Sequence, residues 1–184
     1  MGHRLSKIYT RTGDNGTTGL GDGSRVSKSS LRIRCMGTMD ELNAHISVVL
    51  SYKYEIDESV ARVLTKIQHH LFDLGGELCL PGQERIPQSY VDELESQLDA
   101  YNENLEPLKE FILPGGSKAS SFCHLARTVC RRAESELSQL AETEQLNPVS
   151  LGYVNRLSDL LFVIARNINK TNSIDDVLWQ PGLK

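Results

Sequence analysis

The sequence lacks the features that mark several common classes of protein. Its 184 residues include four cysteines but no CxxC pair, and they contain no secretory signal segment and no long apolar run. The net charge of −4 supplies no general basic field for nucleic acid, so any anion site must be formed locally. We therefore expect a reduced, cytoplasmic, soluble protein that binds neither nucleic acid nor membrane and whose cysteines act as buried small hydrophobic residues.

The sequence also lacks any sustained alternation of apolar and polar residues, which argues against an extended sheet. Apolar residues instead recur at helical spacing, and Asp57, Ser117 and Pro148 stand where helices favour such residues at their start. The predicted helices cover Arg34–Lys53, Asp57–Leu78, Gln88–Asn102, Ser117–Glu142 and Pro148–Lys170. The prediction is one all-α domain, a five-helix antiparallel bundle over 34–170, with an extended Gly/Thr-rich loop at 1–33 and a C-terminal tail at 171–184.

The segment from Lys7 to Lys28 contains five glycines and four threonines, which free the backbone and offer short hydrogen-bonding groups. Arg11, Arg25 and Lys28 are interspersed among them. Composition alone is compatible with an ordinary N-terminal arm or with a loop that holds phosphate.

On the fourth and fifth predicted helices, a stripe of polar residues lies beside the apolar stripe. Arg127, Arg131 and Glu134 follow one another at i, i+4 and i+7. The fifth helix carries a second stripe, made of Asn155, Asp159, Phe162 and Arg166. Salt bridges on a bundle surface would explain any one of these residues, but they explain the group less well.

Five motifs in order resemble the PduO-type ATP:cob(I)alamin adenosyltransferases over nearly the whole chain. They are "YTRTGDNGTT", "GTMDELNA", "FILPGG", "CRRAE" and "NRLSDLLFVIAR". The resemblance implies a homotrimer of five-helix bundles that binds ATP and the corrinoid at each subunit interface. It also implies a reaction in which the 5′-deoxyadenosyl group of ATP passes to the cobalt of cob(I)alamin, giving adenosylcobalamin and triphosphate.

The resemblance implies that the glycine-rich segment wraps the ATP triphosphate, with Mg²⁺ bound to the phosphates. The loop lacks the GxxxxGK[ST] pattern, so it is not a Walker A loop. The implied ATP contacts are Thr10, Arg11, Thr12, Gly13, Thr18, Gly19, Lys28, Arg131, Arg132, Ala133, Glu134, Ser135 and Asn155. The family commonly has arginine where this chain has Ser135, so one contact near the nucleotide differs.

The implied catalytic residues are Asp40, Phe111 and Arg127. Asp40 and Arg127 match an interface ion pair on the corrinoid side, although Asp40 alone would also suit a helix-dipole role. Phe111 matches an apolar residue that displaces the lower axial ligand of cobalt, although composition alone favours a core anchor. No serine or cysteine nucleophile is evident, and none is needed because cobalt supplies the nucleophile.

Two other classes of helical-bundle protein are compared with this sequence. A carboxylate-bridged di-iron bundle needs paired Glu-x-x-His motifs, and the sequence has none. A nucleotide- or corrinoid-binding carrier or regulatory bundle without turnover is the stronger alternative. For the enzyme, the expected partners are a cobalamin reductase and a B12-dependent acceptor enzyme.

Overall fold

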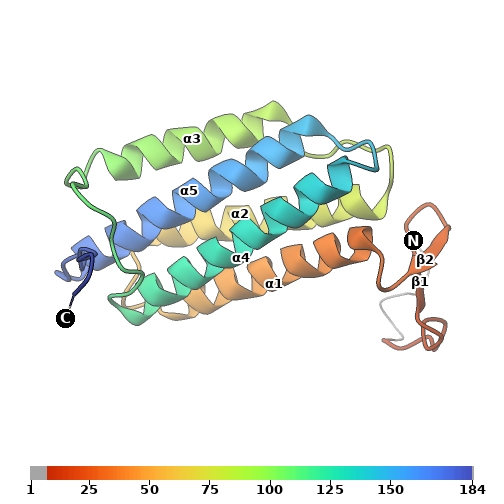
Figure 1. Ribbon diagram of the computed structural model, residues 1–184, viewed down its shortest axis with the longest axis horizontal. Helices are drawn as coiled ribbons and strands as arrows, with labels where there is room; N and C mark the ends of the chain where they lie inside the picture. The colour runs from red at the N-terminus through yellow and green to blue at the C-terminus, as the bar shows by residue number, and fades with distance from the viewer. Residues whose placement is uncertain (1–7, 184) are drawn as a thin grey trace.

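The computed structural model describes residues 8–183, which form an antiparallel bundle of five helices with a small hairpin at one end (Figure 1). The elements are β1 (Thr17–Gly19), β2 (Arg25–Ser27), α1 (Leu31–Ser51), α2 (Glu58–Cys79), α3 (Gln88–Asn102), α4 (Lys118–Ala141) and α5 (Pro148–Thr171). The closest packing joins α4 to α5 and α1 to α4, while α3 packs on α5 and α2 on α1. The predicted all-α bundle is confirmed. None of the helices in the described part is both long and apolar enough to span a bilayer.

Three helices begin at residues whose side chains cap the first turn, close to the starts that the sequence predicts. The Asp57 carboxylate accepts from the Val60 backbone N–H at 2.8 Å, and the Ser117 hydroxyl accepts from Ser120 at 3.2 Å. Asn147 caps α5 directly before Pro148, which lies in the first turn where its missing N–H costs nothing. Each cap satisfies a backbone N–H in the first turn of its helix.

The structure differs from the prediction mainly in the first helix and in the loop before it. The first helix was expected over 34–53, but α1 begins at Leu31 and ends at Ser51. The loop was expected to be without strands, but β1 and β2 pair antiparallel, with Thr18 opposite Val26. Strands of three residues are too short to show a period, which is why the sequence did not reveal them. Gly23, at a φ of +89°, lies in the turn between them.

The core runs along the bundle axis and draws on all five helices. Its largest fully buried side chains include Tyr153, Met39 and Leu42. Cys35, Cys123 and Cys130 are fully buried, which confirms the structural role expected for them, while Cys79 is half-buried. Burial raises the pKa of Cys123 to about 12, so this thiol stays protonated.

Buried polar contacts fasten the end of the bundle that carries the hairpin. Arg32 donates to the Leu78 carbonyl at 2.6 Å and to Glu144 at 2.9 Å, joining α1 to the ends of α2 and α4. The Gly21 N–H donates to the Cys79 carbonyl at 2.7 Å. A Cβ at Gly21 would lie 2.6 Å from the Leu80 side chain and 3.1 Å from the Cys79 carbonyl oxygen, so a larger residue there would require the loop or Leu80 to move.

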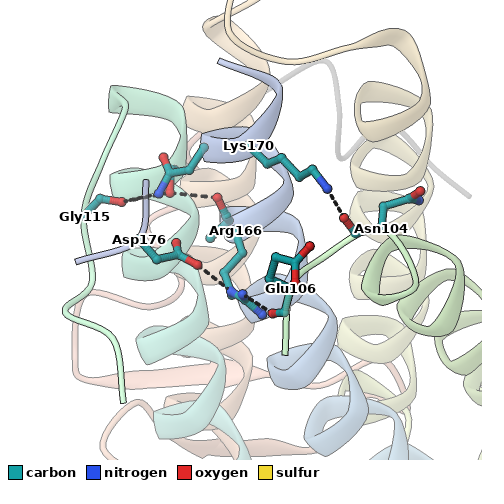
Figure 2. A network of polar contacts seen from close by, with 9 residues as sticks. Asn104, Glu106, Gly115, Arg166, Lys170 and Asp176 are labelled. Carbon is teal, nitrogen blue, oxygen red and sulfur yellow. Dashed lines mark hydrogen bonds and ion pairs between the residues drawn. The ribbon is translucent and has the colours of Figure 1, made fainter. Parts of the chain in front are cut away.

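A second polar network fastens the opposite end, where the "FILPGG" segment crosses the bundle (Figure 2). Arg166 donates to Asp176 at 2.7 Å and to the Glu106 carbonyl at 2.9 Å. The Asn169 amide donates to the Gly115 carbonyl at 3.0 Å. These bonds tie the segment after α3 and the C-terminal tail to α5. Arg166 is therefore buried in this network and is not part of an open polar stripe.

Candidate active site

A groove follows α5 between α3 and α4, with a cavity volume of about 590 Å³. Its α4 wall carries Arg127 and Arg131, and its floor includes Phe162 and Asp159 from α5. A second hollow of about 580 Å³ adjoins it and shares Arg127 and Phe162. The two hollows form one extended site because the same two residues line both.

Arg127 lies at the junction of these hollows. Its guanidinium carbon lies 5.9 Å from the centre of the Phe162 ring, a cation–π arrangement. Its Nε is buried and has no hydrogen-bond partner within residues 8–183. Burial, followed by the charge of Arg131, lowers the pKa of Arg127. A half-buried cation with an unused donor is suited to an anionic or hydrogen-bonding partner from outside the chain.

Arg131 lies one turn further along α4 and is exposed. Within residues 8–183 its side chain makes no hydrogen bond or ion pair. A free guanidinium on a concave wall can bind a phosphate through two parallel hydrogen bonds. By contrast, its neighbour Arg132 forms an ion pair with Glu41 of α1.

A polar pair joins α4 to α5 nearer their connecting loop, outside the set of residues that line the groove. The Asn155 amide donates to a Glu134 carboxylate oxygen at 2.7 Å, which brings two of the predicted contact residues together. Ser135 is exposed on the same helix, whereas Ala133 is fully buried in the core. Of residues 131–135, Ala133 is thus the one whose side chain does not reach the surface.

Phe111 lies at the other end of the extended site, and 75% of its surface is exposed. The interpretation of Phe111 as a core anchor is therefore wrong. Its carbonyl accepts from the Trp179 N–H at 2.7 Å, and the two rings meet edge to face at 6.2 Å. The Leu113 N–H donates to the Val177 carbonyl at 2.8 Å. The C-terminal tail thus holds the segment that presents Phe111 beside the Arg127–Phe162 junction.

His124 was not singled out by the sequence, although it lies one turn before Arg127 on the same helix. It is 3% exposed, and neither ring nitrogen has a hydrogen-bond partner in the part of the chain that the structure describes. Its ring meets the Phe162 ring edge to face at 6.1 Å. Burial, followed by the charge of Arg127, lowers the pKa of His124 to about 4, so the ring is neutral near pH 7.

The N-terminal loop gathers several predicted contact residues around a tight turn. The Arg25 guanidinium donates to the Thr12 carbonyl and to the Thr17 hydroxyl, each at 2.6 Å. A Cβ at Gly13 would lie 3.0 Å from the Lys28 ammonium nitrogen, so the lysine lies directly against the glycine. Arg25 therefore stabilises the loop through two hydrogen bonds, and the Lys28 side chain lies against the Gly13 turn.

Arg11 adopts a positive φ of 60°, a strained conformation for a residue with a side chain. Its guanidinium carbon lies 5.5 Å from the Tyr9 ring centre. Thr10 and Thr12 share a hydrogen bond of 2.9 Å between their hydroxyls. Strain in a loop whose neighbours are fixed by hydrogen bonds is typical of a binding site.

The loop and the groove are not brought together within one chain. The hairpin projects beyond the end of the bundle where α1 begins, while Arg131 lies midway along α4 (Figure 1). No hydrogen bond or ion pair among the described residues joins the two regions. Asp40 is likewise exposed on α1, and it forms no ion pair with Arg127 in residues 8–183.

The chain is similar to characterised proteins over almost its full length. It is 55% identical over 180 residues to a cobalamin adenosyltransferase of Cupriavidus metallidurans, covering 98% of this chain and 97% of that protein. It is 43% identical over 180 residues to a corrinoid adenosyltransferase of Bacillus subtilis, covering 95% of this chain and 92% of that protein.

Solved structures give the same result. A PduO-type ATP:corrinoid adenosyltransferase from Lactobacillus reuteri, a variant with alanine in place of a phenylalanine, was solved with cobalamin and ATP. It matches with a TM-score of 0.88 at 35% identity, over 95% of this chain and 99% of that one. An arginine-to-lysine variant complexed with ATP matches with a TM-score of 0.87 at 35% identity, over 94% and 100% of the two chains.

A model of the family described as cobalamin adenosyltransferase also matches residues 8–168. The chain therefore belongs to the cobalamin adenosyltransferase family.

Proposed function

We propose that this protein transfers the 5′-deoxyadenosyl group of ATP to the cobalt of cob(I)alamin, giving adenosylcobalamin and triphosphate. The observation that carries the proposal is the extended site, in which the unpaired Arg131 leads through the Arg127–Phe162 junction to the exposed Phe111. A polyanion suits one end of such a site and a large apolar ring system suits the other. The family membership and the relatives complexed with cobalamin and ATP support the same pairing of substrates.

The electron pair for the new bond comes from the cobalt of the substrate. Cobalt attacks the 5′ carbon of ATP, the bond between that carbon and oxygen breaks, and triphosphate leaves with the released electron pair. The chain therefore needs no nucleophile of its own; its residues must align the substrates and stabilise the leaving charge.

The ATP end is formed by cations from two regions. Arg131 and Lys28 would neutralise the triphosphate, with the backbone of the Gly13 turn donating further hydrogen bonds. The described residues contain no group of three or more His, Cys, Asp or Glu that could hold a metal. We propose that Mg²⁺ is bound by the phosphates, with Glu134 as the carboxylate that would contact it. The pair of Glu134 and Asn155 then marks the boundary between phosphates and nucleoside.

The corrinoid end is formed by Phe111, Arg127 and Phe162. Phe111 is exposed and held by the tail, so it can press against a corrin ring and keep the lower axial ligand away from cobalt. Four-coordinate cob(II)alamin is easier to reduce, because the removed ligand no longer donates electron density to the metal. The unpaired Nε of Arg127 is consistent with a partner outside the chain, and we propose Asp40 of another subunit as the source of its ion pair.

The distance between hairpin and groove in one chain supports an assembled site. We propose a homotrimer in which the N-terminal loop of one subunit completes the nucleotide site against α4 and α5 of its neighbour. Mutual completion would bring together the two halves of the predicted ATP contacts, which one chain keeps apart.

The test is direct formation of the cobalt–carbon bond. Purified protein is mixed anaerobically with ATP and chemically reduced cobalamin, and the light-sensitive spectrum of adenosylcobalamin is followed. Triphosphate should appear in equal amount, and omission of ATP should abolish both products. Binding of both substrates without either product would favour the carrier or regulatory alternative and overturn the proposal.

A further inference from the structure

Unused hydrogen-bonding capacity is concentrated beneath the corrinoid end of the groove. Among the described residues, five buried side-chain nitrogen or oxygen atoms have no hydrogen-bond partner, and three of them belong to His124 and Arg127. The other two lie in Ser30 and His45, on α1 or directly before it. Buried polar atoms are normally paired, so such a cluster marks a place where function outweighs stability.

The side chains of His124 and Arg127 are chemically complementary. They are three positions apart on α4, and both contact the Phe162 ring, with separations of 6.1 Å for the His124 ring and 5.9 Å for the Arg127 guanidinium carbon. A neutral imidazole has one nitrogen that accepts a hydrogen bond, and the Nε–H of Arg127 is a donor. Side chains at i and i+3 lie close enough for a change of side-chain rotamer to join them.

We propose that His124 is a positioning residue for the transfer reaction, whose neutral ring accepts the Nε–H of Arg127 when substrate encloses the groove. The guanidinium is then fixed beside Phe162 with its terminal N–H groups free for the corrinoid side. This role rests on the proposed function, because it assigns His124 to the site where cobalamin binds.

The surroundings of the ring suit this task. Arg127 lies on the same helix, and Asp176 lies on the C-terminal tail; these are the two charged groups that act on the imidazole. A protonated ring would repel Arg127 and could no longer accept its hydrogen. Burial between α4 and α5 keeps the ring neutral and ready to accept.

The experiment compares three substitutions in the full-length protein. His124→Leu keeps an apolar side chain but removes the acceptor, while His124→Asn and His124→Gln place an acceptor oxygen near the positions of the two ring nitrogens. For His124→Leu we expect kcat/KM for cob(I)alamin to fall on the order of tenfold, with KM for ATP unchanged. Affinity for cob(II)alamin, followed by its visible spectrum without turnover, should fall in parallel. At least one amide variant should restore most of both losses.

Thermal melts and a double mutant separate positioning from packing. His124→Leu should melt at the wild-type temperature or above it, because it removes two unpaired polar atoms from the interior. In an Arg127→Lys background, which lacks the Nε–H, His124→Leu should cause no further loss. Unchanged kinetics and cob(II)alamin affinity in His124→Leu, no rescue by either amide, or additive losses in the double mutant would each overturn the proposal. The proposed function fails by a different result, absence of product with the wild-type protein, while the cob(II)alamin measurement still decides the role of His124.

Discussion

At the scale of single residues, the site is distinguished by cations and aromatic rings that a monomer leaves unsatisfied. Arg131 is exposed on the groove wall and has no hydrogen-bond or ion-pair partner among the described residues, whereas the adjacent Arg132 is already paired with Glu41. The two arginines are neighbours in sequence but differ in what they can offer a ligand. A free guanidinium has its full hydrogen-bonding capacity available, while a paired one must first be released.

Arg131→Ala should weaken ATP binding or turnover and leave the fold intact. A lost hydrogen bond to a charged group costs about 1.5–3 kcal/mol, which corresponds to roughly a 10- to 150-fold change. Calorimetry and steady-state kinetics measure the effect. Arg62→Ala, which removes an exposed cation from α2, is the matched control and should retain wild-type values. Normal ATP affinity and rate in a folded Arg131→Ala protein would refute the assignment.

Phe111→Ala should abolish four-coordinate cob(II)alamin while ATP binding and assembly persist. Because 75% of the side chain is exposed, its removal should cost less than about 1 kcal/mol of stability rather than the 3–5 kcal/mol typical of a core phenylalanine. Electron paramagnetic resonance of bound cob(II)alamin gives the coordination state. Activity should suffer most when cobalt is reduced on the enzyme and less when cob(I)alamin is supplied.

Phe72 provides the control for this experiment. It is 72% exposed on α2, away from the residues that line the two hollows. Phe72→Ala should leave the cob(II)alamin spectrum unchanged. An unchanged four-coordinate signal in Phe111→Ala would end the mechanistic role proposed for that ring.

At the scale of elements, the hairpin and the C-terminal tail fix the positions of candidate site residues that lie outside the helices. The tail pairs with the segment that bears Phe111, and the loop docks on α2 through Gly21. Both contacts are made by backbone groups, so they fix position without restricting the side chains that face a ligand. The backbone fixes these segments and their side chains stay free, which explains why short irregular segments carry so many predicted contact residues.

Gly21→Ala tests whether docking of the loop matters for the nucleotide. The new Cβ would lie 2.6 Å from Leu80 and should push the loop off α2. We expect the KM for ATP to rise, while far-ultraviolet circular dichroism shows an intact bundle. Gly75→Ala is the control, because a Cβ there meets nothing within 4 Å and a helical glycine-to-alanine change is stabilising. An unaltered ATP affinity in Gly21→Ala would show that ATP binding does not depend on docking of the loop on α2.

At the scale of the whole molecule, the described chain holds the two halves of the proposed ATP site apart. Its hairpin extends past one end of the bundle, and its groove opens along the side (Figure 1). Association of copies can unite them. Every copy would then contribute a loop to one site and a groove to another.

Mixed assemblies test this arrangement. Thr12→Ala impairs the loop and Arg131→Ala impairs the groove, and each homotrimer should have low activity. Co-refolded mixtures should recover part of the activity, because some interfaces join an intact loop to an intact groove. Sedimentation equilibrium should give three chains per particle. If mixing restores nothing although mixed particles form, the shared site is wrong.

The sequence by itself determined the five helices, because helical periodicity, the caps at Asp57 and Ser117 and the first-turn proline at Pro148 are local properties of the chain. It also indicated the polar stripe of α4, since Arg127, Arg131 and Glu134 share a face through spacing alone. Its resemblance to a known family selected the candidate contacts. The three-residue strands escaped prediction because a period cannot be seen over so short a length.

Only the tertiary structure decided which of these side chains face solvent, the core or one another. Phe111 is exposed because the tail pairs with its backbone, and Arg166 is buried because Asp176 returns to meet it. His124 loses its hydrogen bonds because α5 and its Phe162 ring cover it. Each outcome depends on a segment distant in sequence, and burial, pairing and the pKa of a side chain follow from what covers it rather than from its own helix.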